Sequence, residues 1–198
     1  MKYCKICFEE IKKQGFHSII KQKVICQNCY NKFDVIYKKE KINNYNVLSV
    51  YKYNDFTKKL IYQFKGCYDI ELKDVFLQRH LSYLKIKYYN YLIVNVPSSK
   101  EDDNERGFNH IVEIFSSLGC VRNYLYKKFN FKQSSLGIKD RSRIKDRLGI
   151  VNGEKLHNKK VLIVDDILTS GSSVKACIEL IKEYKPKRIE ILILCRNC

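Results

Sequence analysis

Long hydrophobic runs are missing from this chain. No stretch of about 18 consecutive apolar residues occurs in it, which argues against a membrane-spanning helix. The first residues also lack the apolar core of a secretory signal peptide. We therefore expect a soluble, cytoplasmic protein without a transmembrane segment. A chain of 198 residues can bury one good α/β core with a small appendage, but not two large domains.

Acidic residues are scarce relative to basic ones. The chain has 38 Lys and Arg against 21 Asp and Glu, a formal net charge of +17. Clustered cations bind nucleic acid because they release counterions from its phosphates. Scattered lysines in a chain rich in Lys, Ile, Asn and Tyr equally suit an ordinary solvated surface. Both interpretations stay open at the level of composition.

The nine cysteines do not have the pattern of a secreted disulfide scaffold, because the signal peptide is missing and the cysteines cluster in pairs. Cys4-x-x-Cys7 and Cys26-x-x-Cys29 have the spacing of a structural zinc ribbon, with four thiolates around one Zn²⁺. A module of roughly forty residues is too small to bury a core of its own, so the metal would fold it. The closed four-sulfur site leaves no open position for catalysis.

Lysines and aromatic residues surround these four cysteines. They could form a basic, stacking-capable surface for single-stranded nucleic acid. The alternative is that the aromatic rings pack beneath the ribbon and the lysines keep it soluble. The aromatic residues concerned are Tyr3, Phe8, Phe16, Tyr30 and Phe33.

Strands and helices alternate in the rest of the chain. Apolar and alternating runs predict strands at residues 47–53, 91–96, 121–126, 160–164 and 189–194. Helical periodicity covers residues 55–65, 70–84, 108–118 and 173–184, and polar residues 38–46 are the best linker candidate. This order predicts an α/β domain over residues 47–198, a mostly parallel sheet flanked by helices, after a zinc-ribbon module over residues 1–40.

Residues 160–173 carry the most informative motif. An apolar strand ends in Asp165 and Asp166, and a hydroxyl-rich turn with Gly171 leads into a helix. Backbone N–H groups of such a turn and the positive helix end bind anions. The expected phosphate-binding residues are Thr169, Ser170, Gly171, Ser172 and Ser173. The two carboxylates would accept hydrogen bonds from a ribose diol or hold Mg²⁺.

Three rival interpretations use similar residues. A Walker A loop needs a lysine after its last glycine, and none follows Gly171. A phospho-receiver domain needs several further βα units, but only residues 167–198 follow Asp166. An ordinary strand, turn and helix is less favoured, because two carboxylates plus Thr-Ser-Gly-Ser-Ser exceed what capping requires.

Two further segments suit phosphate. Arg106 and Gly107 precede a predicted helix and could form a second anion site at the same sheet edge as Asp165, which would fit a substrate with two phosphate centres. Residues 133–147 form a polar, cationic stretch in which three arginines gather. Such a stretch is typical of a lid or binding loop, although a solvated basic helix is nearly as well supported.

The sequence VLIVDDILTSGSSV resembles the phosphoribosyl-pyrophosphate (PRPP) motif of the type I phosphoribosyltransferases. Across nearly the full length, the chain resembles one subgroup, the ComF (competence protein F) family. The elements that carry this resemblance, in order, are the four-cysteine module, Phe64-Lys65-Gly66, Val96-Pro97, Arg106-Gly107-Phe108-Asn109, and Gln133, Leu136 and Arg141 ahead of the PRPP motif.

The resemblance implies a role for each motif. Asp165 and Asp166 would hold the ribose hydroxyls, and residues 169–173 the 5′-phosphate of PRPP, which binds with Mg²⁺. Arg106 and Gly107 would belong to the pyrophosphate loop, and Gln133 and Arg141 to a mobile hood.

The resemblance also implies a function in DNA uptake during natural transformation. The implied partners are single-stranded DNA and a competence helicase or DNA-processing proteins. If the protein is an enzyme, a nitrogen nucleophile would displace pyrophosphate from C1′. The catalytic residues would then be Asp165 and Asp166, which position the ribose, and Arg106, which stabilises the leaving group. The alternatives are a non-catalytic adaptor that senses PRPP or a nucleotide and binds DNA, and a nucleotide-salvage phosphoribosyltransferase.

Overall fold

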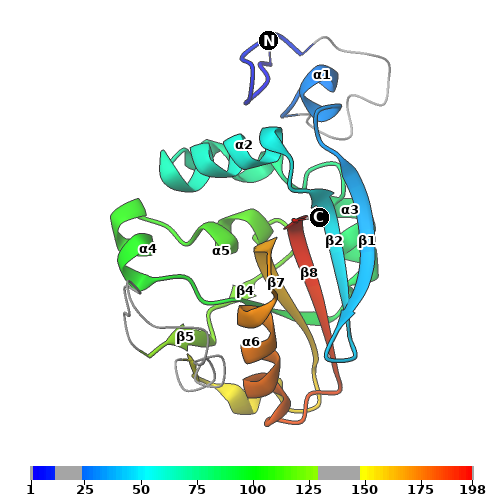
Figure 1. Cartoon of the computed structure of the whole chain (residues 1–198), viewed down its shortest axis with the longest axis vertical. Helices are drawn as coiled ribbons and strands as arrows, with labels where there is room; N and C mark the ends of the chain where they lie inside the picture. Colours follow the sequence, from blue (N-terminus) through cyan, green and yellow to red (C-terminus); the bar gives the residue numbers. More distant parts are fainter. Residues whose placement is uncertain (1, 12–23, 129–147, 198) are drawn as a thin grey trace.

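The computed structural model describes residues 2–11, 24–128 and 148–197 (Figure 1). Its helices are α1 (Gln27–Tyr30), α2 (Asp55–Gly66), α3 (Leu81–Lys87), α4 (Lys100–Arg106), α5 (His110–Phe115) and α6 (Ser172–Lys182), with 3₁₀ helices η2 (Ile70–Val75) and η4 (Gly153–Leu156). Its strands are β1 (Val35–Ile42), β2 (Tyr45–Lys52), β3 (Tyr91–Asn95), β4 (Val121–Arg122), β5 (Leu125–Lys127), β6 (Leu148–Ile150), β7 (Lys160–Leu168) and β8 (Arg188–Arg196).

Six strands form the main sheet, in the order β1-β2-β8-β7-β3-β4. All neighbouring pairs are parallel except the edge pair of β1 with β2. The central strands β7 and β8 are buried along most of their length, as expected of strands covered by helices on both faces. The predicted fold class, a mostly parallel sheet flanked by helices, is confirmed.

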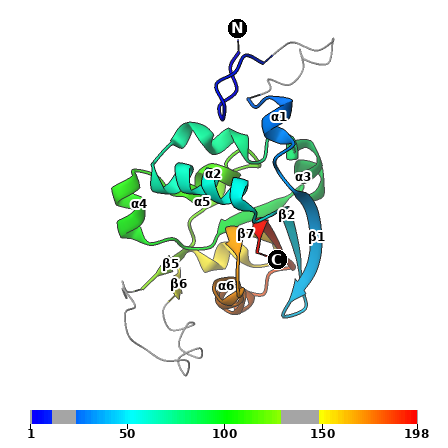
Figure 2. The ribbon, with the colours of Figure 1, turned by 45° about the horizontal axis from the view of Figure 1, so that its top comes forward.

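The connections of β3 and β7 diverge. From β7 the chain passes through α6 to β8, whereas from β3 it passes through α4 and α5 to β4, on the other side of the pair. Figure 2 shows α6 on one side of the strands and α2 and α5 on the other. Open α/β sheets bind ligands in the crevice at the carboxyl ends of two such strands. The Val96 N–H donates to the Val164 carbonyl at 2.9 Å, so the loop after β3 starts beside the residue of β7 that precedes Asp165.

Helix α2 closes over the carboxyl ends of these strands. Asn54 begins it with a capping box, in which Asn54 Oδ1 accepts from the Thr57 N–H and Thr57 Oγ1 accepts from the Asn54 N–H, both at 2.9 Å. Leu60, Ile61 and Phe64 are buried on its inner face. This packing fixes the rotation of the helix about its axis and thereby the direction in which its last turn points.

Residues 70–84 do not form the single helix that their periodicity predicted. They form η2, a turn and the start of α3. The Tyr51 hydroxyl donates to the Phe76 carbonyl at 2.7 Å, and the His80 N–H donates to Leu77 instead, at 2.8 Å. A buried tyrosine from β2 therefore takes the carbonyl that a continuous helix would bond to residue 80.

Two other expectations for secondary structure were wrong. Residues 38–46 are not a linker but a β-hairpin, whose turn residues Asn43 and Asn44 have φ of 47° and 68°, as a type I′ turn requires. Residues 121–126 form two short strands in different sheets, β4 in the main sheet and β5 with β6. The division into residues 1–40 and 47–198 stays a prediction. Within the described ranges, no helix combines the length and apolarity needed to cross a membrane.

Candidate functional site

Asp165 and Asp166 lie near the carboxyl end of β7, at the divergence point of the sheet. The Asp166 N–H donates to Asp165 Oδ1 at 3.0 Å, and the Ile167 N–H donates to Asp166 Oδ1 at 2.8 Å. These local hydrogen bonds fix both carboxylates at the strand end. The side chain of Asp166 is only 10% exposed, so its charge needs partners.

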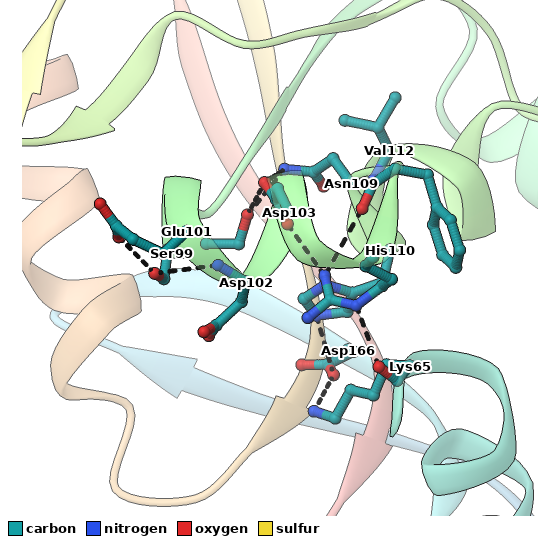
Figure 3. Close-up of polar contacts among 12 residues, drawn as sticks. Lys65, Ser99, Glu101, Asp102, Asp103, Asn109, His110, Val112 and Asp166 are labelled. Carbon is teal, nitrogen blue, oxygen red and sulfur yellow. Dashed lines mark hydrogen bonds and ion pairs between the residues drawn. The ribbon is translucent and has the colours of Figure 1, made fainter. Parts of the chain in front are cut away.

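Lys65 and His110 are the partners of this carboxylate. Lys65 Nζ, from the last turn of α2, lies 2.9 Å from Asp166 Oδ2. His110 Nε2, from the first residue of α5, lies 3.3 Å from the same oxygen. Figure 3 shows Lys65 and His110 approaching Asp166 from different helices. Asp166 is therefore the meeting point of α2, α5 and β7.

The surroundings of the two carboxyl groups shift their pKa values in opposite directions. Burial, and next the charge of Asp166, raise the pKa of Asp165 well above its ordinary value. Burial alone would also raise the pKa of Asp166, but the hydrogen bond from His110 and the charge of Lys65 outweigh it and hold that pKa well below its ordinary value. Asp166 thus carries the negative charge of the pair.

The turn after β7 is open to solvent at Thr169 and Ser170. Gly171 has φ of 73° and precedes α6, and the Ser170 and Ser172 hydroxyls lie 2.8 Å apart. Because the first N–H groups of a helix have no intrahelical acceptor, this turn presents backbone donors together with hydroxyl groups. Such groups can bind a phosphate, and a phosphate site at residues 169–173 stays a prediction.

Arg196, at the end of β8, binds the carbonyls at the start of this turn. Its Nη1 donates to the Leu168 and Thr169 carbonyls at 3.2 and 3.1 Å. Its Nε lies 2.8 Å from Glu40 Oε1 of β1. The edge hairpin and the last strand therefore together hold the start of the turn.

The Arg106 loop lies beside the acidic pair but is bonded inward. The Arg106 side chain is 8% exposed, and its guanidinium donates to Asp103 Oδ1 at 2.9 Å and to the Lys65 carbonyl at 3.0 Å. Nη1 of Arg106 also lies 3.2 Å from His110 Nδ1. Gly107, with φ of 79°, ends α4. A role of Arg106 and Gly107 in binding pyrophosphate stays a prediction, and it requires Arg106 to exchange some of these contacts.

Asp103 organises the first part of this loop. Its Oδ2 accepts from the Ser98 hydroxyl. It also accepts from the Asn109 amide at 2.7 Å, as Figure 3 shows. Asn109 also caps α5, since its Oδ1 accepts from the Val112 N–H at 3.0 Å. A cleft of about 320 Å³ opens beside this network, between the end of β3 and the β5–β6 pair.

The sequence did not indicate His110 as a site residue, and it indicated no individual role for Lys65. Lys65 stands 101 residues before Asp166. Its only signal was its place in the Phe64-Lys65-Gly66 element, and His110 has none beyond its position after Asn109. The proposed hood residues Gln133 and Arg141 lie outside the described residues.

The four N-terminal cysteines come together. Their Sγ atoms all lie within 4.8 Å of one another, and Cys7 Sγ lies 3.7 Å from Cys26 Sγ. Tetrahedral Zn²⁺ with Zn–S bonds of about 2.3 Å places its sulfurs about 3.8 Å apart, so the group fits a zinc ion. Burial alone would raise the pKa of Cys4, but backbone hydrogen bonds, the strongest at Cys26, lower it to about 7. These four residues could therefore bind structural zinc.

The chain is similar to several known proteins. Residues 104–197 match the Phosphoribosyl transferase domain family. The chain is 28% identical to Competence protein ComFC of Streptococcus pneumoniae over 98% of its own length and 86% of that protein. It is 40% identical to Phosphoribosyltransferase domain-containing protein 1 of Xenopus tropicalis, but over 25% of this chain and 23% of that one.

Among solved structures, a hypoxanthine phosphoribosyltransferase from Staphylococcus aureus aligns with a TM-score of 0.40 and 19% identity, over 64% of each chain. The chain therefore spans slightly less than two thirds of the length of that structure.

Proposed function

Since this chain is a phosphoribosyltransferase-like protein of the ComF type, we propose that it binds PRPP with Mg²⁺ and acts in the cytoplasm in DNA uptake during natural transformation. One observation supports PRPP as the ligand. The acidic pair Asp165 and Asp166 and the hydroxyl-rich turn at residues 169–173 lie together where the connections of two parallel strands diverge. The name of the relative, Competence protein ComFC, supports the biological role.

Each group in the crevice has a task in this proposal. Asp165 and Asp166 accept hydrogen bonds from the ribose hydroxyls, and residues 169–173 surround the 5′-phosphate. Arg106 and Gly107 lie on the pyrophosphate side. The carboxylate oxygens are ligands that suit Mg²⁺, which usually binds through one or two carboxylates plus substrate phosphates. When bound, the ion would neutralise charge on the pyrophosphate.

If turnover occurs, the C1′–O bond to pyrophosphate breaks and a C1′–N bond to a nitrogen nucleophile forms. The residues of this chain contribute by position and charge. Asp166 holds the sugar, and Arg106 stabilises the charge of the departing pyrophosphate.

Calorimetric titration with Mg²⁺ and PRPP tests the ligand. We expect Asp165→Asn and Asp166→Asn each to weaken binding by about tenfold or more, because each replaces a carboxyl oxygen that can accept from the ribose with an amide nitrogen that cannot. Asp55→Asn, at an exposed position on α2, is the matched control and should bind as the wild type does. Equal affinities for all four proteins would refute the assignment. A screen of nitrogen bases for pyrophosphate release would then identify an acceptor, salvage bases included.

A second candidate is a non-catalytic adaptor that binds single-stranded DNA and works with a competence helicase or DNA-processing proteins. The net charge of +17 favours it. The same variants decide whether DNA and PRPP share a site: DNA affinity that is unchanged in Asp166→Asn indicates separate surfaces. DNA affinity that does not fall with added salt would remove the electrostatic argument.

A further inference from the structure

Among Lys65, His110 and Asp166, only Lys65 has substantial access to solvent. Its side chain is 35% exposed, whereas those of His110 and Asp166 are 9% and 10% exposed. Its ammonium is therefore free to leave along the solvent side, while His110 remains enclosed. A lysine side chain is suited to such a move because it carries a point charge on four flexible methylenes.

The backbone of Lys65, in contrast, is anchored. Its carbonyl accepts a hydrogen bond from Arg106 Nε at 3.0 Å, which ties the last turn of α2 to the loop after β3. The Phe64 side chain beside it is fully buried. The base of the lysine side chain is thus fixed between the acidic pair and the Arg106 loop, and only its ammonium can change partner.

Oδ2 of Asp166 cannot accept from a ribose hydroxyl while it keeps both of its present contacts. Oδ1 accepts from the Ile167 N–H, and Oδ2 contacts Lys65 and His110. A sugar hydroxyl that binds Oδ2 must displace one of these two partners, and the exposed lysine is the one that can leave. Asp166 keeps His110 as a hydrogen-bond donor during this exchange, so its buried carboxylate is not left without a partner.

We propose that Lys65 is a substrate-binding cation that exchanges partners. This inference rests on the proposed function. In the free protein the ammonium neutralises Asp166. In the complex a ribose hydroxyl replaces it on Oδ2, and the ammonium moves to the diphosphate at C1 of the sugar. The exchange is non-covalent, and the lysine thereby favours a pentose phosphate with a second anionic group over one without it.

The test compares two sugars that differ at C1, PRPP and ribose 5-phosphate, each titrated calorimetrically with Mg²⁺. In Lys65→Gln we expect PRPP affinity to fall about tenfold to a hundredfold, the cost of one charge-assisted hydrogen bond. Ribose 5-phosphate affinity should stay the same or rise, because its hydroxyl no longer competes with an ammonium for Asp166. Lys65→Arg keeps the charge and should bind PRPP within a few-fold of the wild type.

Lys59→Gln is the matched control, since Lys59 is exposed on the same helix. Thermal unfolding of each variant establishes that it is folded before titration. Equal weakening of both sugars in Lys65→Gln would overturn the proposal, because it would make Lys65 a support for Asp166 or a contact to the 5′-phosphate. Unchanged PRPP affinity would also overturn it. A wild-type protein that binds neither sugar would instead refute the proposed function itself, and this inference with it.

Discussion

His80 is a titratable residue in an aromatic environment. Its side chain is 3% exposed, its Nδ1 is hydrogen-bonded to the Tyr37 hydroxyl, and the rings of Tyr37 and Tyr51 lie 5.3 and 5.2 Å from it. Burial, and next the charge of Arg79, lower the pKa of His80 from 6.5 to about 4. The folded protein therefore keeps this imidazole neutral in a range where the unfolded chain would protonate it.

This shift predicts a pH dependence of stability. Between the unfolded pKa of 6.5 and the folded pKa of about 4, the unfolded chain binds more protons, so the free energy of unfolding rises with pH. The stabilisation is complete above the unfolded pKa and is lost as the pH falls through the folded one, a change of about 3 kcal/mol. Denaturant unfolding of the wild type at pH 7 and pH 5 should show part of this loss.

His80→Phe removes the titration but keeps a ring. We expect it to be less stable than the wild type at pH 7, because Tyr37 loses its partner, and to depend less on pH. His157→Gln, at an exposed position, should retain the wild-type pH dependence. If His80→Phe loses as much stability between pH 7 and pH 5 as the wild type does, His80 is not the titrating group.

At the scale of elements, the turn between β7 and α6 depends on strands that are distant in sequence. Gly171 has φ of 73°, and a Cβ at this position would lie 3.2 Å from Ile42 Cδ1, at the end of β1. Arg196 of β8 holds the preceding carbonyls and is itself paired with Glu40 of β1. The turn is therefore shaped by its own glycine and braced by the edge hairpin.

Gly171→Ala tests this bracing. Left-handed backbone costs a residue with a Cβ about 1–2 kcal/mol, and the tight contact with Ile42 should add to that loss in the free energy of unfolding. Gly107→Ala provides the matched control, because Gly107 has φ of 79° but a Cβ there would have no neighbour within 4 Å. Equal losses in the two variants, measured by denaturant unfolding, would mean that the hairpin gives way without cost.

Elements governed by local signals could be predicted from the sequence. Strand β7, the turn with Gly171 and helix α6 follow from an apolar run and a glycine, and α2 follows from Asn54 and its periodic apolar face. Strand β1 was missed because it is a polar edge strand, half of whose residues are exposed. The break after η2 was missed because Tyr51, from another element, causes it.

The same distinction applies to the site. The acidic pair and its turn are contiguous, so their chemistry is visible in the sequence. The partners of Asp166 come from two other helices, and packing of Phe64 and capping by Asn109 bring them into place. No local pattern encodes a contact between residues 65 and 166, because it depends on how α2 crosses the ends of the sheet.

At the scale of the whole molecule, the cysteine module docks on the segment that contains η2. Lys5 Nζ lies 3.1 Å from Glu71 Oε2 and 3.2 Å from Asp74 Oδ2. The Arg79 guanidinium lies 4.1 Å from the centre of the Tyr30 ring. The acidic partners of Lys5 are exposed, so each of these two ion pairs contributes little by itself. We therefore expect the module's own order to come mainly from the metal that its four cysteines could bind and from the few rings it buries, such as Phe33.

Loss of the metal should unfold this module while the sheet remains folded. We expect Cys26→Ser to lose the bound zinc, about one ion per chain, and to become sensitive to protease before β1, because a structural zinc site supplies much of the folding energy of a small module. The sheet has its own buried core, so PRPP affinity should stay within a few-fold of the wild type.

Cys67→Ser, at an exposed cysteine outside the cluster, should keep its zinc. Metal analysis, limited proteolysis and titration measure the three effects. Full zinc content in Cys26→Ser would contradict the four-cysteine site, and cleavage throughout the sheet would contradict the predicted division into a zinc module and a phosphoribosyltransferase-like domain.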